Sequence, residues 1–188
     1  MRADAARRRQ NIIEHAKHVF AERGGDVALE AVAAAGGVGI ATLYRNFPSR
    51  EDLVRAVVQD MVEQITGAVD SARTDLETDP TGAWKKLLSS LMSMKLGALT
   101  DGLALQAGAR DLDSTPLAQV QQPALDALNN VLAELRRQRA IREDLRALDV
   151  IVAVATITRP QVSPIRGAAP GVPEQLAEAY LLWSLGGS

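Results

Sequence analysis

The sequence has 188 residues, 47% hydrophobic and 23% charged, which is enough apolar material for one or two small domains with packed cores. It holds no cysteine, which excludes disulfides, thiolate zinc sites and cysteine nucleophiles. The net charge is −2, yet residues 1–58 hold nine Lys and Arg against seven Asp and Glu, while the remainder holds twelve against sixteen. A slightly basic end on an acidic body weakly favours an anionic partner for that end.

No segment has the basic flank and apolar run of about 7–15 residues that mark a signal peptide. The longest nearly uninterrupted apolar run, Val150 to Ala155, is too short to span a bilayer. We therefore expect a cytoplasmic protein with no membrane partner.

The N-terminal residues predict three helices joined by glycine-containing turns. The first covers 6–23, because Ile13, Ala16 and Phe20 recur at helical spacing, and Gly24 follows its end. A short second helix covers 28–35, and a third covers 40–46. Ser49, followed by acidic residues at 51 and 52, is a helix-start signal for a long fourth helix that extends to about residue 76.

The rest of the chain predicts further helices over 82–99, near 101–109 and from 116, where Pro123 indicates a kink or a split. The almost wholly apolar segment 146–157 predicts a buried helix, although its Val and Ile content would also permit a strand. Residues 158–172, rich in Pro and Gly, predict a loop, and 174–185 a last helix. The prediction is an all-α fold of about nine helices.

The second and third predicted helices, with their glycine turn, have the outline of a helix-turn-helix, whose second element enters the DNA major groove. Leu43 and Phe47, four residues apart, are predicted to pack inward on the first helix. The polar side chains that remain turn outward and offer donors and acceptors for phosphates and base edges: Thr42, Tyr44, Arg45 and Asn46. Arg50, in the first turn of the fourth helix, is placed to reach a phosphate.

The run from Leu29 to Leu53, with Thr-Leu-Tyr at 42–44 followed by Phe47, Pro48 and Arg50, closely resembles the DNA-binding signature of the TetR family of repressors. The resemblance covers residues 8–57, about a quarter of the chain, and includes the Ile-Ala-Phe-Gly spacing of the first helix. Beyond that segment only the number and order of helices are similar. The resemblance implies a DNA-binding domain over 1–52 and a helical effector-binding and dimerisation domain over 53–188.

Carried over by position, the family's DNA-contacting residues correspond to Gly39, Ile40, Ala41, Thr42, Tyr44, Arg45, Asn46 and Arg50. Of these, Tyr44 and Arg50 match the usual phosphate contacts. One position departs from the family: Ala28 stands where a Thr commonly caps the second helix and touches phosphate. We expect a lower DNA affinity or a shifted backbone contact, with Asp26 as an alternative cap.

The implied protein is a homodimer that joins through its last two helices, binds a pseudo-palindromic operator in double-stranded DNA and is released by a small hydrophobic effector. Apolar stripes are usually plain core, but some of these side chains could instead line an effector cavity. The candidates are Met61, Ile65, Trp84, Leu88, Met92, Leu105 and Leu128.

Other chemistry has little support. No phosphate-binding loop or His-Glu-x-x-His motif is present, and His15 and His18 have no third metal ligand nearby in the sequence. We therefore expect no enzyme activity, cofactor or metal. Arg7-Arg8-Arg9 is interpreted as a solvated run, with phosphate or minor-groove contact as the alternative. A second hypothesis is a helical protein that binds a small molecule or partner and has weakened or lost DNA binding.

Overall fold

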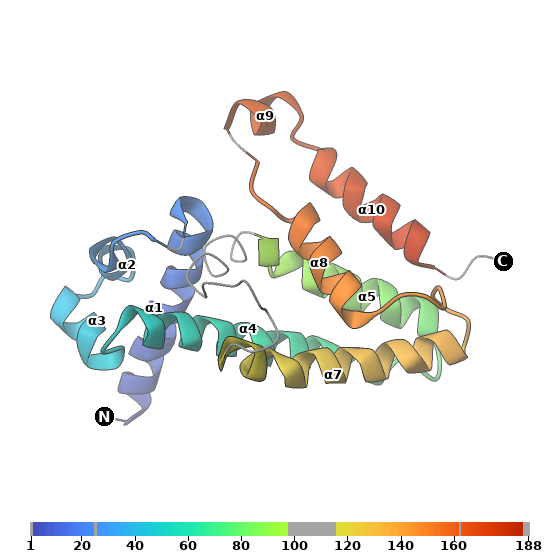
Figure 1. The fold of residues 1–188 in the computed structure, drawn as a ribbon, viewed down its shortest axis with the longest axis horizontal. Coiled ribbons are helices and arrows are strands. Elements are labelled where there is room, and N and C mark those ends of the chain that lie inside the picture. The colour runs from blue at the N-terminus through green and yellow to red at the C-terminus, as the bar shows by residue number, and fades with distance from the viewer. Residues whose placement is uncertain (1, 25, 98–115, 162, 186–188) are drawn as a thin grey trace. The chain divides into compact units, whose positions relative to one another are not determined.

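The computed structural model describes residues 2–24, 26–97, 116–161 and 163–185. These residues form nine α-helices and no strand, which confirms the all-α prediction (Figure 1). The helices are α1 (Arg2–Arg23), α2 (Leu29–Ala35), α3 (Ile40–Asn46), α4 (Arg50–Arg73), α5 (Pro80–Ser93), α7 (Pro116–Arg137), α8 (Ala147–Ile157), α9 (Ser163–Ala168) and α10 (Val172–Ser184). The helix predicted near 101–109 lies outside the described residues.

The described residues fall into two compact units. The first holds the residues up to Met61 together with 116–121, and the second holds 62–97 and 122–185. The division between the units falls inside α4, nine residues beyond the functional boundary that we predicted after residue 52, and that boundary stays a prediction.

The core of the first unit is formed by the inner faces of α1, α2, α3 and the start of α4. Phe20, Val32, Leu43 and Leu53 are each fully buried there, one from each of these helices. Gly24 ends α1 with a positive φ of 85°, the left-handed conformation that glycine adopts without strain. The short helices α2 and α3 and the start of α4 thus pack with α1 around a core of their own.

The turn between α3 and α4 is fixed by a reciprocal capping pair, which contains the Ser49 cap that the sequence indicated. The Ser49 hydroxyl accepts from the Asp52 amide at 3.0 Å, and the Asp52 carboxylate accepts from the Ser49 amide at 3.2 Å. Further along, Asp60 of α4 pairs with Lys17 of α1 at 2.7 Å. These contacts fix the first three turns of α4 against the helices of the first unit.

In the second unit, α5, α8 and α10 pack on one another around Trp84. The Trp84 side chain is fully buried, and its Nε1 donates to the Ser184 hydroxyl at 2.8 Å. Asp79 caps α5 by accepting from the Gly82 amide at 2.8 Å. The indole is therefore a structural anchor between the start of α5 and the end of α10.

The predicted continuous helix over 82–99 is wrong at its C-terminal end. The helix stops at Ser93, and Lys95 has a φ of 52°, which no α-helix contains. Just beyond this break the Gly97 amide donates to the Thr158 hydroxyl at 2.9 Å, at the end of α8. A Cβ on Gly97 would lie 1.8 Å from the Ala155 carbonyl oxygen, so the chain turns here to let two backbones meet.

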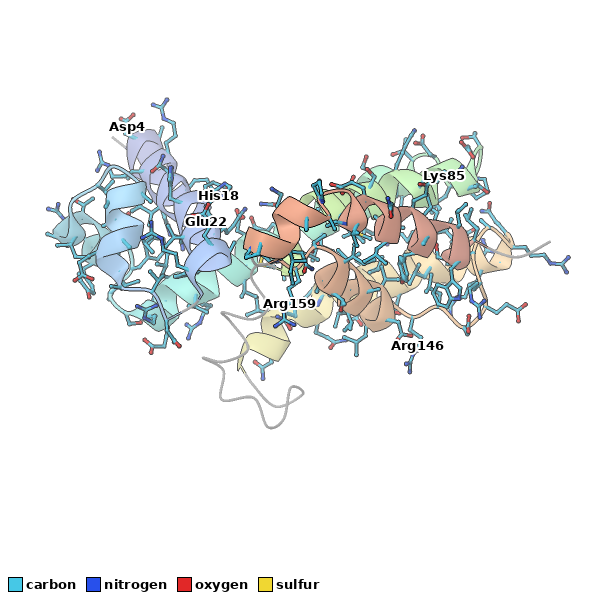
Figure 2. The ribbon with its side chains drawn as sticks, turned by 90° about the horizontal axis from the view of Figure 1, so that it is seen from above. Asp4, His18, Glu22, Lys85, Arg146 and Arg159 are labelled. Carbon is cyan, nitrogen blue, oxygen red and sulfur yellow. The ribbon has the colours of Figure 1, made fainter. Side chains whose placement is uncertain are left out.

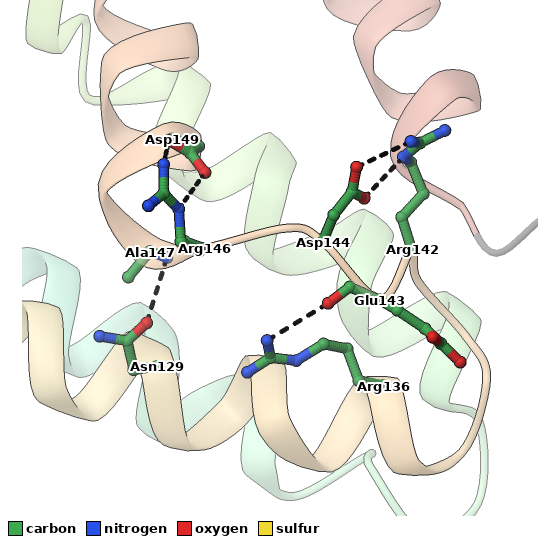
Figure 3. A network of polar contacts seen from close by, with 8 residues as sticks. All are labelled: Asn129, Arg136, Arg142, Glu143, Asp144, Arg146, Ala147 and Asp149. Atoms are coloured by element: carbon green, nitrogen blue, oxygen red, sulfur yellow. Dashed lines mark hydrogen bonds and ion pairs between the residues drawn. The ribbon is translucent and has the colours of Figure 1, made fainter.

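The connection between α7 and α8 is held by polar contacts (Figure 3). Since Arg146 offers no side-chain cap for α8, Asn129 of α7 accepts from the Ala147 amide at 3.2 Å. Bidentate hydrogen bonds from Arg142 and Arg146 hold the pKa values of Asp144 and Asp149 below their usual range. Pro123 does not split α7, which is continuous from Pro116 to Arg137.

Two predictions for the C-terminal part need correction. Residues 158–172 are not all loop, because they contain the short helix α9. The segment 146–157 is a helix, but within this chain only one side of it is buried. Ala147, Val150 and Val154 are covered, whereas Leu148 is 58% and Val152 55% exposed. Among the described residues, no helix is both long and apolar enough to cross a membrane.

Candidate nucleic-acid interface

The third helix of the first unit presents two chemically different sides. Leu43 is fully buried and Phe47, which directly follows the helix, is 1% exposed, so both pack into the core as predicted. On the other side Tyr44 is 46% exposed and Arg45 is also exposed. A helix of seven residues is too short to be stable alone, so the buried pair holds it in place for the outer side chains.

The outer polar side chains of α3 are ordered by contacts among themselves. The Arg45 guanidinium donates to the Thr42 hydroxyl at 2.8 Å, and the Asn46 amide donates to the Thr42 carbonyl at 2.7 Å. Arg45 and Asn46 are the residue types that read guanine and adenine edges in the major groove. Because these contacts leave further donors on both side chains, the helix offers an ordered polar surface.

The start of α3 contributes less polar chemistry. Gly39 is the N-cap residue and, like Ala41, is exposed, so both could approach DNA closely through the backbone. Ile40 is only partly exposed and packs against the core of the first unit. The structure thus brings all seven predicted residues of 39–46 onto or beside α3, with Ile40 turned partly inward.

Arg50 lies in the first turn of α4, as predicted, and one of its guanidinium nitrogens donates to the carbonyl of Val27. That contact ties the start of α4 to the segment that precedes α2. The side chain is partly buried, so its local role is to join these two elements at the edge of the outer surface of α3.

Ala28 is the N-cap residue of α2 and supplies no side-chain hydrogen bond to the helix. Its φ of −59° and ψ of 138° suit an N-cap, so the backbone is arranged for a capping side chain that alanine lacks. Asp26 makes no hydrogen bond within the described part of the chain and does not substitute for it.

No single observation places the predicted effector residues together at one site. Met61 belongs to the first unit, while Ile65, Trp84, Leu88, Met92 and Leu128 belong to the second. Ile65, Leu88 and Leu128 are buried, Met61 and Met92 are partly exposed, and the Trp84 nitrogen already bonds Ser184. Leu105 lies outside the described residues, and the set stays a prediction.

One contact beside α3 was not predicted. The Arg9 guanidinium lies over the Phe47 ring, with its Cζ 4.9 Å from the ring centroid. In the sequence, only the helical spacing of Arg9 from the core positions of α1 pointed to this contact. The pairing with Phe47 depends on how α1 packs beside the end of α3, which the sequence alone does not indicate. The two histidines of α1 have ordinary surroundings: His15 bonds the Asn11 carbonyl at 2.8 Å, and His18 is exposed (Figure 2).

Comparison with known proteins agrees with this geometry. The family model described as "Bacterial regulatory proteins, tetR family" matches residues 12–57. A TetR transcriptional regulator from Streptomyces coelicolor is 30% identical, with 96% of this chain and 99% of that chain covered and a TM-score of 0.62. One from Mycobacterium vanbaalenii is also 30% identical, covering 95% and 97%, with a TM-score of 0.59. A search of curated protein sequences gave no match.

A more distant structure shows the same fold. The TetR-like regulator LfrR from Mycobacterium smegmatis, in complex with proflavine, is 22% identical over 94% of this chain and 93% of its own, with a TM-score of 0.66. An all-helical chain with a helix-turn-helix in its first unit and these relatives is a DNA-binding transcriptional regulator. It belongs to the TetR family.

Proposed function

We propose that the chain is a ligand-responsive repressor that binds a pseudo-palindromic operator as a homodimer and is released by a small hydrophobic effector. The observation that carries the DNA-binding part is the outer side of α3. Tyr44 is 46% exposed beside Arg45, while Leu43 behind them is fully buried. A half-exposed tyrosine next to an arginine on a firmly packed short helix suits phosphate and base-edge contact.

The proposed DNA contacts are Gly39, Ile40, Ala41, Thr42, Tyr44, Arg45, Asn46 and Arg50, within a domain over 1–52. Tyr44 binds phosphate through its hydroxyl, and Arg45 and Asn46 read base edges. Arg50 keeps its bond to Val27 and directs other N–H groups of its guanidinium to a phosphate.

The proposed homodimer forms through α8 and α10, within the domain over 53–188. These helices pack on each other, and their outer sides carry large exposed apolar residues. Leu148 and Val152 lie one turn apart on α8, and on α10 Leu182 is 64% and Trp183 50% exposed. Several large apolar side chains exposed on two packed helices are costly in water and favour burial against a second copy. A two-fold axis would then present two α3 helices to successive major grooves.

The proposed effector is a small hydrophobic molecule that binds among the apolar residues of the second unit. One supporting analogy is LfrR, whose structure was obtained in complex with proflavine. The dimer would have two states that differ in the spacing of its two DNA-binding units, one of which fits the operator. An effector would release the DNA only if it binds the other state more tightly.

A binding experiment tests the DNA-reading part. Duplexes selected by the protein from a random-sequence library, and a mixed-sequence duplex as reference, would be titrated by fluorescence anisotropy. Arg45→Ala is expected to weaken binding to the selected duplexes by about tenfold or more, and binding to the reference duplex much less, since base contacts carry specificity. Arg55→Ala, an exposed change on the same unit, is the matched control. Failure to select any sequence would contradict operator binding and favour a regulator that has lost it.

The effector part has its own test. Hexanol, octanol, decanol and proflavine would each be added to the preformed complex with a selected duplex, and the anisotropy followed. Release by any of them at a concentration that leaves the thermal unfolding of the protein intact supports the proposal. If none releases the duplex, a small hydrophobic effector is the wrong assignment.

A further inference from the structure

We propose that Arg9 is a further DNA contact that binds a backbone phosphate beside the end of α3, and that Phe47 is the positioning residue that holds it there. The inference rests on the proposed DNA binding by α3 and adds a contact from a different helix. The family model begins its match at residue 12, so Arg9 lies outside the matched segment.

The first observation is that Arg9 is part of a helix and not of a flexible arm. α1 begins at Arg2, so two helical turns precede Arg9. A cation on such a frame loses less conformational freedom on binding than one on a disordered tail. The contact of Arg9 with Phe47 places this part of α1 beside the residue that follows α3.

The second observation is the cation–π contact between Arg9 and Phe47. The Arg9 Cζ lies 4.9 Å from the centroid of the Phe47 ring, and Phe47 directly follows Asn46 of α3. Phe47 is 1% exposed, so its ring is fixed by the core and provides a rigid platform. A cation–π contact holds the guanidinium over the ring without using its N–H donors in a hydrogen bond, so these donors can bind a phosphate.

The third observation is the charge environment. Arg7, two residues earlier, pairs with Asp4 at 2.7 Å. Arg9 has no carboxylate partner within the part of the chain that the structure describes, although it is exposed. Of the three arginines at 7–9, Arg7 is therefore partly neutralised, whereas Arg9 carries an uncompensated charge beside the helix proposed to enter the groove.

A phosphate is the partner that fits this position. When a helix lies in the major groove, the sugar–phosphate backbone flanks it on both sides, and cations from neighbouring elements meet that backbone. Arg9 comes from α1, to the side of α3, so its contact is expected to be independent of sequence. It should strengthen binding to every duplex and increase the salt dependence.

The experiment compares Arg9→Gln with Arg7→Gln, because both remove one exposed positive charge from the same helix. The full-length variants would be titrated with a mixed-sequence duplex of about 30 base pairs by fluorescence anisotropy at several salt concentrations. For Arg9→Gln we expect about tenfold weaker binding at low salt and a slope of log affinity against log salt reduced by about one. Arg7→Gln should change both quantities much less. Both positions are exposed, so both variants should unfold thermally like the parent protein.

Three outcomes would overturn the proposal. Equal effects of Arg9→Gln and Arg7→Gln would reduce Arg9 to a general contribution to net charge. A loss confined to A·T-rich duplexes would mean minor-groove reading in place of a phosphate contact. No effect of Arg9→Gln while Arg45→Ala loses sequence selectivity would refute the inference and leave the proposed function standing. If the parent protein binds no duplex at all, the proposed function falls first.

The role of Phe47 has a separate readout. Phe47→Leu keeps an apolar side chain in the core but removes the aromatic platform, so the Arg9→Gln effect on affinity should shrink in the Phe47→Leu background. An undiminished Arg9→Gln effect in that background would mean that Phe47 does not position the guanidinium.

Discussion

The first unit and the pair formed by α8 and α10 differ in how many large hydrophobic side chains they leave exposed to solvent. Among the described residues, eight large hydrophobic side chains are exposed, and seven of them lie between Leu148 and Trp183. The eighth is Tyr44, on α3. The first unit, apart from this one residue, has therefore placed its large apolar side chains inside, whereas the C-terminal helices have not.

The contrast indicates two kinds of partner. Tyr44 stands among Thr42, Arg45 and Asn46, so its surroundings suit a polar, charged surface such as DNA. On α8 and α10 the exposed residues are Leu, Val and Trp, which gain free energy only when another apolar surface covers them. Each region thus carries the chemistry of a different interface, and the changes below are ordered from the largest expected effect to the smallest.

The largest effect is expected from Leu182→Glu. Leu182 is 64% exposed on α10, so the change leaves the fold of one chain intact but places a charge in the proposed dimer interface. Dimer dissociation should become easier by at least about 30-fold, as for a central interface residue. Analytical ultracentrifugation over a concentration series measures this, and the monomer should also bind a selected duplex more weakly.

The matched control for this change is Lys85→Glu, which alters an exposed residue of α5 in the same unit (Figure 2). It should leave the sedimentation behaviour unchanged. A Leu182→Glu protein that remains dimeric at the lowest concentration measured would show that the exposed apolar side of α10 has another role.

The second effect concerns the backbone contact beneath α8. Gly97→Ala would place a Cβ 1.8 Å from the Ala155 carbonyl oxygen and 2.6 Å from the Arg159 amide nitrogen, so the end of α8 must shift. We expect the free energy of unfolding to fall by about 1–3 kcal/mol or more, as for other overpacked sites. Denaturant titration followed by circular dichroism measures it.

Gly67→Ala is the control for the glycine change. Nothing lies within 4 Å of a Cβ built on Gly67, and the residue is exposed within α4. Alanine should therefore raise the free energy of unfolding by up to about 1 kcal/mol through its higher helix propensity. If both variants are stabilised, the tight approach at Gly97 does not exist in solution.

The comparison also shows how far the sequence carries the prediction. The ends of α3 were predicted at residues 40 and 46, and the Ser49 cap was predicted correctly. Both depend on neighbouring residues: the Leu43–Phe47 spacing, and Ser49 followed by acidic residues at 51 and 52. The outward orientation of Tyr44 and Arg45 followed from the same spacing. Local rules were sufficient wherever the determining contacts lie within about one turn of helix.

Features that depend on contacts between residues far apart in the chain could not be predicted from the sequence. The break after Ser93 depends on the approach of Gly97 to α8, about 60 residues later in the chain, and no local pattern indicates it. The short helix α9 lies in a Pro-rich and Gly-rich stretch that local rules assign to loop. Likewise, the apolar run at 146–157 predicted burial but not that only one side of α8 would be covered by this chain.

The third effect concerns α2 in the first unit. Ala28→Ser would supply the missing capping oxygen at a residue whose backbone already has N-cap dihedrals. The free energy of unfolding should rise by about 1 kcal/mol. The hydroxyl should also tighten binding to a mixed-sequence duplex, since the resemblance to the family implies a phosphate contact at this position.

The control is Ala34→Ser, an exposed change within the same helix. Serine there should lower stability by a few tenths of a kcal/mol, because it is a weaker helix former than alanine. If Ala28→Ser lowered the free energy of unfolding as Ala34→Ser is expected to do, the start of α2 would differ from the capped geometry inferred here.

The smallest effect at neutral pH is expected from Tyr180→Phe on α10. The Tyr180 hydroxyl is buried and has no hydrogen-bond partner within the described part of the chain. Burial, with the nearby Asp149 carboxylate as a second cause, raises the pKa of Tyr180 to about 12 from its ordinary 10.0. Removing an unpaired hydroxyl should leave the stability near pH 7 unchanged or raise it by up to about 1 kcal/mol.

The pH dependence of stability tests the burial of the Tyr180 hydroxyl. Because the pKa of Tyr180 is higher in the folded state, the folded protein holds this proton more strongly than the unfolded chain does. The stability that comes from this stronger proton binding is complete below pH 10 and is lost as pH rises toward 12. Tyr180→Phe should flatten the fall in unfolding free energy across that window. An unchanged alkaline slope in Tyr180→Phe would mean that water reaches the hydroxyl. The α8–α10 pair would then be as open to solvent at Tyr180 as α3 is at Tyr44.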